Sequence, residues 1–314
     1  MPVCARVDGT GKLEGRAETL LGDFSQRSAH GANAFVATKL APYPSRLTRA
    51  SFVDAARASA RRLRVDKLDV VQCHWSTSRY APWQEEVGAC VRSMLREVAF
   101  RHARSSCVNL TTLLICFALL CCVTQALVQG MGDVYDAGLA GGVGVSNYGV
   151  AQLRKVHAAL AARGVPLVSA QVQYCLLSRD PERSGMREAC DELGVRLIAY
   201  SPLCLGALSG KYDADGALPP GPRGLLLSSL LRDAKPLLAL QREIAVAHGV
   251  SAPQVAVNWC RAKGALPIPG IRSVAQARDA MACLSWALDD AEVAELDAVS
   301  ARCKGTVQNI FQTA

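Results

Sequence analysis

The chain alternates short apolar runs with longer segments in which apolar residues recur at helical spacing. The apolar runs predict buried strands over residues 34–39, 68–75, 142–146, 166–174, 195–201 and 266–269. The helical spacing predicts helices over residues 51–63, 150–163, 181–193, 236–248, 252–262, 274–284 and 289–299. Ser51 is the expected N-cap of the first helix, and Gly164 and Gly194 mark two helix ends.

Strands that alternate with helices through short turns indicate βαβ units and a parallel sheet. The strands are apolar almost throughout, so we expect helices or loops to cover both faces of the sheet. A doubly wound sheet and a (β/α)8 barrel both satisfy this pattern. No G-x-G-x-x-G follows the first strand, and polar residues stand at the carboxyl ends of the strands, where a barrel builds its active site. The prediction is therefore an α/β fold of the TIM-barrel class.

Two of these strand-end residues are chemically versatile. Lys39 ends one apolar run and could lower the pKa of a neighbouring hydroxyl, while His74 ends the next and could orient a carbonyl or share in proton transfer. Taken singly, each residue is better explained without catalysis, Lys39 as a salt-bridged lysine at the barrel mouth and His74 as a core histidine whose hydrogen bonds are satisfied.

Further polar residues follow the later strands. Ser146 and Asn147 stand between a strand and a helix, where they would cap the helix or bind an amide of a ligand. Gln171 lies within an apolar strand and needs a hydrogen-bond partner if it is buried. Tyr200 offers a face for stacking. Residues 269–273 precede a helix, and Arg272 and Ser273 there suit a phosphate.

Composition narrows the class of protein. Half of the 314 residues are hydrophobic and 20% are charged, which indicates a folded protein with a sizeable core. The net charge is +8, but a nucleic-acid binder needs clustered basic residues interleaved with aromatic ones, and only 5% of residues are aromatic, which argues against nucleic-acid binding. The 13 cysteines are scattered without a C-x-x-C, so we expect buried thiols in a reducing compartment and no metal site.

One segment does not fit a soluble barrel. Cys107–Val128 carries no charge over its length and follows two arginines, so it is the one candidate membrane span. Its continuous apolar core, 113–123, is short for a span, which favours an added helix or sequence foreign to the mature fold.

The ordered set of motifs resembles the aldo-keto reductases, and most closely the chloroplast-type members of plants and algae. The motifs are VATKLAP around Lys39, DVVQCHWS (69–76), GGVGVSNY (141–148), SAQVQYCLLSR (169–179), GVRLIAYSPLCLGALSGKY (194–212) and PIPGIRS (267–273). The resemblance covers roughly residues 15–95 and 130–305.

The resemblance implies a (β/α)8 barrel that binds NADP(H) and reduces a small-molecule aldehyde or ketone to an alcohol by hydride transfer. It assigns Lys39 and His74 to catalysis. It assigns Ser146, Asn147 and Gln171 to the nicotinamide carboxamide and Tyr200 to ring stacking. Ser201, Leu203, Gly206 and Lys211 match the loop over the pyrophosphate. Gly270, Arg272, Ser273 and Gln276 match the segment around the 2′-phosphate, which favours NADP over NAD. No metal is implied.

The chain departs from the family pattern upstream. Asp8 stands nearest to the position of the family's catalytic Asp, and the family's proton-donating Tyr has no counterpart before Tyr43. The first barrel strand and most of the second would lie before Met1, and residues 85–130 form an atypical insertion within a single barrel domain over residues 1–314. A gene model that lacks a 5′ end and retains an intron would explain both departures.

Three hypotheses follow. The chain is an NADPH-dependent carbonyl reductase, or a non-catalytic NADP(H)-binding regulatory protein on the same fold, or a protein anchored through Cys107–Val128. The expected compartment is the chloroplast or the cytoplasm. The sequence leaves the substrate and the oligomeric state open.

Overall fold

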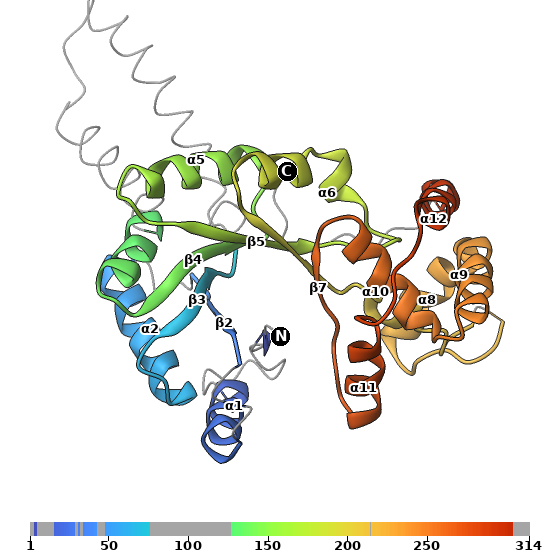
Figure 1. The fold of residues 1–314 in the computed structure, drawn as a ribbon, viewed down its shortest axis with the longest axis horizontal. Coiled ribbons are helices and arrows are strands. Elements are labelled where there is room, and N and C mark those ends of the chain that lie inside the picture. The colour runs from blue at the N-terminus through green and yellow to red at the C-terminus, as the bar shows by residue number, and fades with distance from the viewer. Residues whose placement is uncertain are drawn as a thin grey trace, which may run out of the picture. The chain divides into compact units, whose positions relative to one another are not determined.

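A computed structural model describes residues 3–4, 16–28, 31, 34–42, 48–75, 127–213 and 215–303 (Figure 1). These residues form two compact units, and the boundary falls between Ser169 and Ala170, inside a strand. Each unit is described by itself.

The first unit is built on a parallel sheet. Its strands β1 (Val3–Cys4), β2 (Val36–Leu40), β3 (Leu68–Cys73) and β4 (Ala140–Ser146) are neighbours in chain order. Nearly every residue of β2, β3 and β4 is buried, as the continuous apolar runs predict. At Gly144 in β4, a Cβ would lie 2.3 Å from the Ser169 hydroxyl oxygen and would displace it, so the two strands approach closely at this glycine.

Helices α1 (Arg16–Arg27), α2 (Arg49–Leu63), α5 (Val150–Ala161) and one over residues 127–136 complete the first unit. The predicted N-cap Ser51 is wrong, because α2 begins earlier. Thr48 is the N-cap, and Ser51 completes a capping box by accepting from the Thr48 backbone N–H. Helix α1 was not predicted, because it exposes Leu20 and Phe24 and buries Glu18. Glu18 accepts from the Thr38 hydroxyl and pairs with Arg62 at 2.6 Å.

The second unit continues the alternation. Strand β5 (Leu167–Gln173) enters it at Ala170, and β6 (Arg196–Tyr200) pairs in parallel with β7 (Leu266–Ile268), with Tyr200 opposite Ile268. The Tyr174 N–H, just beyond β5, donates to the Tyr200 carbonyl oxygen at 3.3 Å. The carboxyl ends of β5 and β6 are thereby joined.

The helices of the second unit follow most of the predicted ranges. They are α6 (Asp180–Arg183), α7 (Met186–Glu192), the 3-10 helix η3 (Cys204–Ser209), α8 (Pro222–Asp233), α9 (Lys235–Ala247), α10 (Ala252–Ala262), α11 (Val274–Ala282) and α12 (Asp290–Arg302). The single helix predicted over 181–193 is wrong, because Gly185 adopts a φ of 74° and separates α6 from α7.

Six of the cysteines are buried free thiols, as predicted: Cys73, Cys175, Cys190, Cys204, Cys260 and Cys283. No helix within the described ranges has the length and apolar character needed to cross a membrane. The candidate span Cys107–Val128 falls outside those ranges except for its last two residues, and the predicted insertion over 85–130 falls outside them up to residue 126.

Candidate active site

The carboxyl ends of β2, β3 and β4 bring three of the predicted residues to one edge of the first sheet. Lys39 lies opposite Gln72, and the His74 N–H donates to the Leu40 carbonyl oxygen at 3.0 Å. Cys73 lies opposite Val145, so His74 and the residues after β4 are neighbours, and Asn147 Nδ2 donates to the His74 carbonyl oxygen at 3.0 Å. Parallel strands place their carboxyl ends together, so residues 39, 74 and 147 meet although they are distant in sequence.

His74 is held in its neutral form at this edge. Burial, followed by the positive charge of Lys39, lowers the pKa of His74 to about 4. Its Nδ1 atom is buried and has no hydrogen-bond partner among the described residues, while its ring centroid lies 4.3 Å from that of Trp75. The N–H of a neutral imidazole can donate to the carbonyl oxygen of a ligand.

Ser146 and Asn147 are not the cap of the following helix, because Gly149 occupies the N-cap position of α5. The Ser146 hydroxyl oxygen is buried and makes no hydrogen bond within the described part of the chain. Asn147 adopts a φ of 63°, a left-handed conformation that Asn tolerates better than most residues. Of the two alternatives that the sequence left open, the structure therefore excludes the capping role.

Tyr148 adds a contact that the sequence did not predict. Its hydroxyl donates to the Cys73 thiol at 3.5 Å, and burial raises the pKa of Cys73 to about 11. The thiol is thus neutral near pH 7, and the Tyr148 hydroxyl is directed at a group next to His74 in the chain.

In the second unit, Gln171 and Tyr200 occupy strand positions. Gln171 is 2% exposed within β5, and Tyr200 is the last residue of β6, partly exposed. The Tyr174–Tyr200 backbone hydrogen bond fixes the strand end from which Tyr200 projects.

The segment 201–211 after β6 has an unusual backbone. Positive φ angles occur at Ser201 (53°), Cys204 (45°), Leu205 (54°) and Gly206 (95°), and again at Gly210 (68°). Non-glycine residues at positive φ are strained. The turns are closed by backbone hydrogen bonds, from the Cys204 N–H to the Ser201 carbonyl oxygen at 2.9 Å and from the Gly206 N–H to the Leu203 carbonyl oxygen at 2.8 Å. The four residues predicted for the pyrophosphate all lie in this segment: Ser201, Leu203, Gly206 and Lys211.

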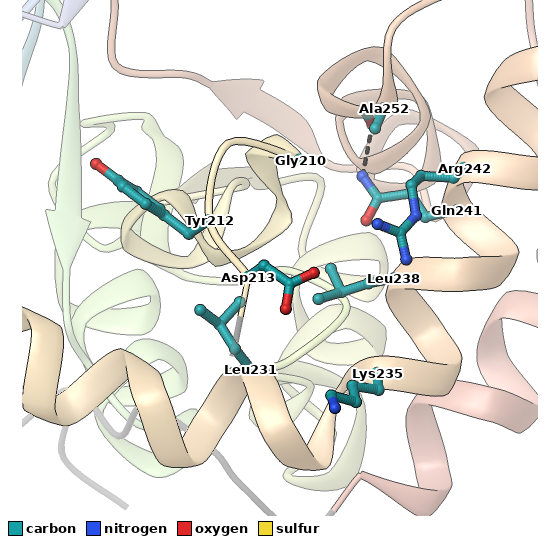
Figure 2. Close-up of a pocket in the computed structure, with 9 residues that line it drawn as sticks. All are labelled: Gly210, Tyr212, Asp213, Leu231, Lys235, Leu238, Gln241, Arg242 and Ala252. Carbon is teal, nitrogen blue, oxygen red and sulfur yellow. Dashed lines mark hydrogen bonds between the residues drawn. The ribbon is translucent and has the colours of Figure 1, made fainter. Parts of the chain in front are cut away.

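A cavity of about 20 Å³ lies beside the end of this segment (Figure 2). Gly210, Tyr212 and Asp213 line it from the segment and its continuation, and Lys235 and Gln241 line it from α9. Nothing in the sequence points to this cavity, because its walls come from loop and helix residues without a recognisable motif.

The segment 270–276 leads into the N-terminus of α11. Ser273 is the N-cap and accepts from the Gln276 N–H at 3.2 Å, while the Arg272 N–H donates to Gln276 Oε1 at 2.7 Å. All residues from Gly270 to Gln276 are exposed. This arrangement leaves the Arg272 side chain and the helix N-terminus accessible to an anion in solution.

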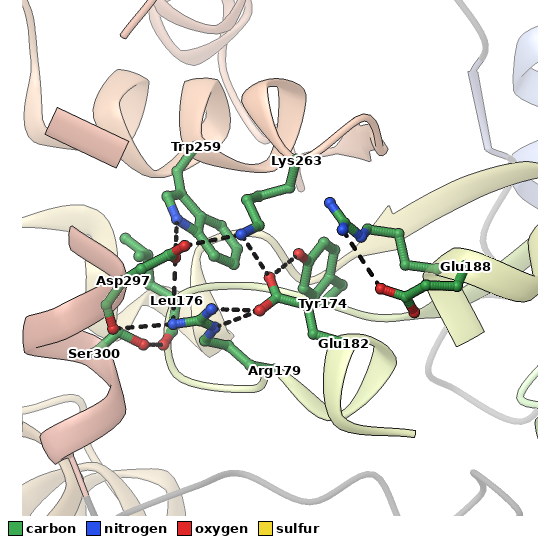
Figure 3. Close-up of polar contacts among 10 residues, drawn as sticks. Tyr174, Leu176, Arg179, Glu182, Glu188, Trp259, Lys263, Asp297 and Ser300 are labelled. Carbon is green, nitrogen blue, oxygen red and sulfur yellow. Dashed lines mark hydrogen bonds and ion pairs between the residues drawn. The ribbon is translucent and has the colours of Figure 1, made fainter. Parts of the chain in front are cut away.

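A polar network that the sequence did not predict surrounds Glu182 and the Tyr174 hydroxyl (Figure 3). The Tyr174 hydroxyl donates to Glu182, which also pairs with Arg179 and, at 3.3 Å, with Lys263. Lys263 Nζ also donates at 2.8 Å to the Asp297 carboxylate, so Lys263 bridges Glu182 and Asp297. Burial and Glu182 raise the pKa of Tyr174 far above its usual range, so this tyrosine is a structural hydrogen-bond donor.

Asp8, the candidate for the family's catalytic Asp, lies outside the described residues. Within the parts of the chain that the structure describes, no cluster of His, Cys, Asp and Glu could hold a metal ion.

Comparison with known proteins extends the motif resemblance. The family model "Aldo/keto reductase family" matches residues 13–301. The chain is 44% identical to the chloroplastic pyridoxal reductase of Arabidopsis thaliana over 97% of this chain and 74% of that protein. It is 32% identical to an uncharacterized oxidoreductase of Mycobacterium tuberculosis over 87% of this chain and 68% of that protein. The solved structure of a thermostable aldo-keto reductase superposes with a TM-score of 0.62 at 22% identity, over 95% of this chain and 81% of that one.

These matches agree with the parallel strands of the structure, and the fold is an α/β fold of the TIM-barrel class. The chain belongs to the aldo/keto reductase family of oxidoreductases.

Proposed function

We propose that this protein is an NADPH-dependent carbonyl reductase whose substrate is an aromatic aldehyde, with pyridoxal as the first candidate. The observation that carries the proposal is the edge of the first sheet, where Lys39, neutral His74 and Asn147 are held together. The similarity to a pyridoxal reductase, at 44% identity, supports the choice of aldehyde.

The residues present fit a bound nicotinamide dinucleotide. The Ser146 hydroxyl oxygen is buried without a partner among the described residues, and such a group is costly unless a ligand bonds it. Ser146, Asn147 and Gln171 would hold the carboxamide, and Tyr200 would stack on the ring. The segment 201–211 would hold the pyrophosphate, and the segment 270–276 the 2′-phosphate. When bound, NADPH supplies the hydride that reduces the carbonyl carbon.

His74 and Lys39 would act on the carbonyl oxygen. Neutral His74 can donate a ring N–H to this oxygen and so fix its position. The Lys39 ammonium group would stabilise the negative charge that develops on the oxygen, an effect that is strongest where water is excluded. The proton that completes the alcohol would come from Lys39, which would regain it from solvent water.

A second candidate function is NADP(H) binding without turnover. It is favoured by the absence of the family's Tyr from its expected place after Asp8. Two other tyrosines follow strand ends, but their hydroxyls already donate within the protein, that of Tyr148 to Cys73 and that of Tyr174 to Glu182. The loss of a general acid costs about 10²–10⁴-fold in rate.

One experiment distinguishes the two candidate functions. NADPH binding is followed by quenching of tryptophan fluorescence, and NADPH oxidation is followed with pyridoxal, for the wild type and for Lys39→Met. Under the first function the wild type oxidises NADPH, whereas Lys39→Met binds NADPH but does not oxidise it. Tight NADPH binding without oxidation supports the second function. If the wild type does not bind NADPH, both are wrong.

We further propose that residues 1–314 act as one barrel domain and that the protein works in the chloroplast or the cytoplasm. The chloroplastic location of the Arabidopsis relative supports the first compartment.

A further inference from the structure

Gln241 is a polar side chain in the buried face of α9. It is 1% exposed, and Leu237 and Ile244 on the same helix are buried beside it. Burial of an amide is unfavourable unless its polar atoms are hydrogen-bonded. Gln241 Nε2 donates to the carbonyl oxygen of Leu208 at 2.9 Å and to that of Ala252 at 2.5 Å. The amide therefore joins two segments that lie outside its own helix.

The first of these segments is the strained stretch after β6. Leu208 is fully buried in η3, and two residues later Gly210 turns the backbone with a φ of 68° into Lys211. The Gln241–Leu208 hydrogen bond thus holds the end of the segment 201–211, for which we propose pyrophosphate binding.

The second segment leads to the other end of the proposed cofactor site. Ala252 is the first residue of α10, and the hydroxyl of the preceding Ser251 donates to both oxygens of Asp279 on α11, at 2.8 and 2.9 Å. Gln254 Nε2 donates to the same carboxylate at 2.7 Å. Helix α11 begins at the Ser273 cap, so a short series of hydrogen bonds links Gln241 to the segment 270–276.

The other half of the Gln241 amide makes no such link. Its Oε1 atom is buried, lacks a hydrogen-bond partner among the described residues, and belongs to a side chain that lines the cavity beside Gly210 and Asp213 (Figure 2). Both hydrogen bonds of the amide come from the Nε2 group, so a substitution that removes this donor tests them together.

We propose that Gln241 is a positioning residue that sets the spacing between the segments 201–211 and 270–276. The affinity for a dinucleotide that carries both a pyrophosphate and a 2′-phosphate would depend on this spacing, whereas binding of a fragment that needs only one segment would not. This inference rests on the proposed function, because it presupposes NADPH as the ligand.

The test replaces Gln241 with Met, which keeps the length of the side chain and removes the donor. Binding of NADPH and of adenosine 2′-monophosphate is measured by calorimetry. We expect the dissociation constant of NADPH to rise about tenfold, because two buried hydrogen bonds are lost. The dissociation constant of adenosine 2′-monophosphate should change by less than about twofold.

Ile244→Ala is the matched control, because it removes packing from the same buried helix face one turn away and no hydrogen bond. It should lower the melting temperature and leave NADPH affinity unchanged. If Gln241→Met does not fold, Gln241→Asn takes its place, because its amide is one methylene too short to reach both carbonyls.

Three results would overturn the inference: unchanged NADPH affinity in the Gln241 variant, equal weakening of NADPH and the fragment, or equal weakening by Ile244→Ala. Failure of the proposed function is recognised separately, because the wild type itself would then not bind NADPH.

Discussion

At the scale of single residues, the neutral state of His74 links the candidate active site to the stability of the protein. The pKa of His74 is about 4 in the folded protein and has its ordinary value of 6.5 in the unfolded protein. As the pH falls, His74 therefore takes up its proton in the unfolded protein first, which favours unfolding. The free energy of unfolding should therefore be independent of His74 above pH 6.5 and should fall between pH 6.5 and 4. By pH 4.5 the loss amounts to about 2–3 kcal/mol.

Urea unfolding of the wild type and of His74→Gln at pH 7.5 and 4.5 measures this loss. The decrease between the two pH values should be smaller in His74→Gln by about 2–3 kcal/mol. Equal decreases would show that His74 is protonated in the folded protein.

Arg272 gives a prediction about cofactor choice. Arg272→Ala should weaken NADPH binding about tenfold and leave NADH binding nearly unchanged, because only NADPH carries the 2′-phosphate that a guanidinium group can pair with. Arg278→Ala, an exposed arginine on the following helix, is the control and should affect neither cofactor. Equal weakening of NADPH and NADH by Arg272→Ala would contradict the role of Arg272.

The positions of these residues could be predicted from the sequence, but their electrostatics could not. Lys39, His74 and Asn147 each follow or end an apolar run, and such a run ends where a parallel strand reaches the edge of its sheet. The low pKa of His74 depends on burial and on Lys39, which is distant in the chain, so no local pattern could reveal it. Gln241 was missed because a single polar residue within an apolar helix face carries no motif.

At the scale of elements, the sequence predicts strands and most helices well, and the errors have physical causes. Strands that are apolar on both faces and helices with one apolar face leave clear patterns. Helix α1 leaves none, since it packs through Glu18 and exposes Leu20 and Phe24. The break at Gly185 was missed because the residues on either side of it continue a helical pattern.

The polar network around Glu182 predicts an effect on stability. Glu182→Ala removes the acceptor of the Tyr174 hydroxyl in a half-buried site, and it removes one of the two acidic partners of Arg179 and of Lys263, which both keep Asp297. We expect a loss of about 2 kcal/mol in the free energy of unfolding, measured in urea, because a buried hydroxyl loses its hydrogen bond and two partly buried cations lose a partner.

Glu188→Ala is the control for this network. Glu188 pairs with Arg187 at 3.4 Å near the surface, where the loss should stay below about 1 kcal/mol. A similar small loss in both variants would show that the network around Glu182 contributes little.

At the scale of the whole molecule, the order of the motifs is enough to identify the family, because six signatures in one order are far more specific than any single one. The fold identifies the family but does not determine which reaction the protein catalyses, since one fold supports many reactions. The proposed reductase activity therefore depends on whether the strand-end residues Lys39, His74 and Asn147 support reduction of a carbonyl.

The most direct test follows a label from cofactor to product. The protein is incubated with pyridoxal and NADPH that carries deuterium at the transferable position of C4, and the alcohol product is analysed by mass spectrometry. We expect an alcohol with one deuterium on its new carbinol carbon, formed by the wild type and not by Lys39→Met. NADPH that binds while no deuterated alcohol forms would contradict the reductase and leave a protein that binds the cofactor without using it.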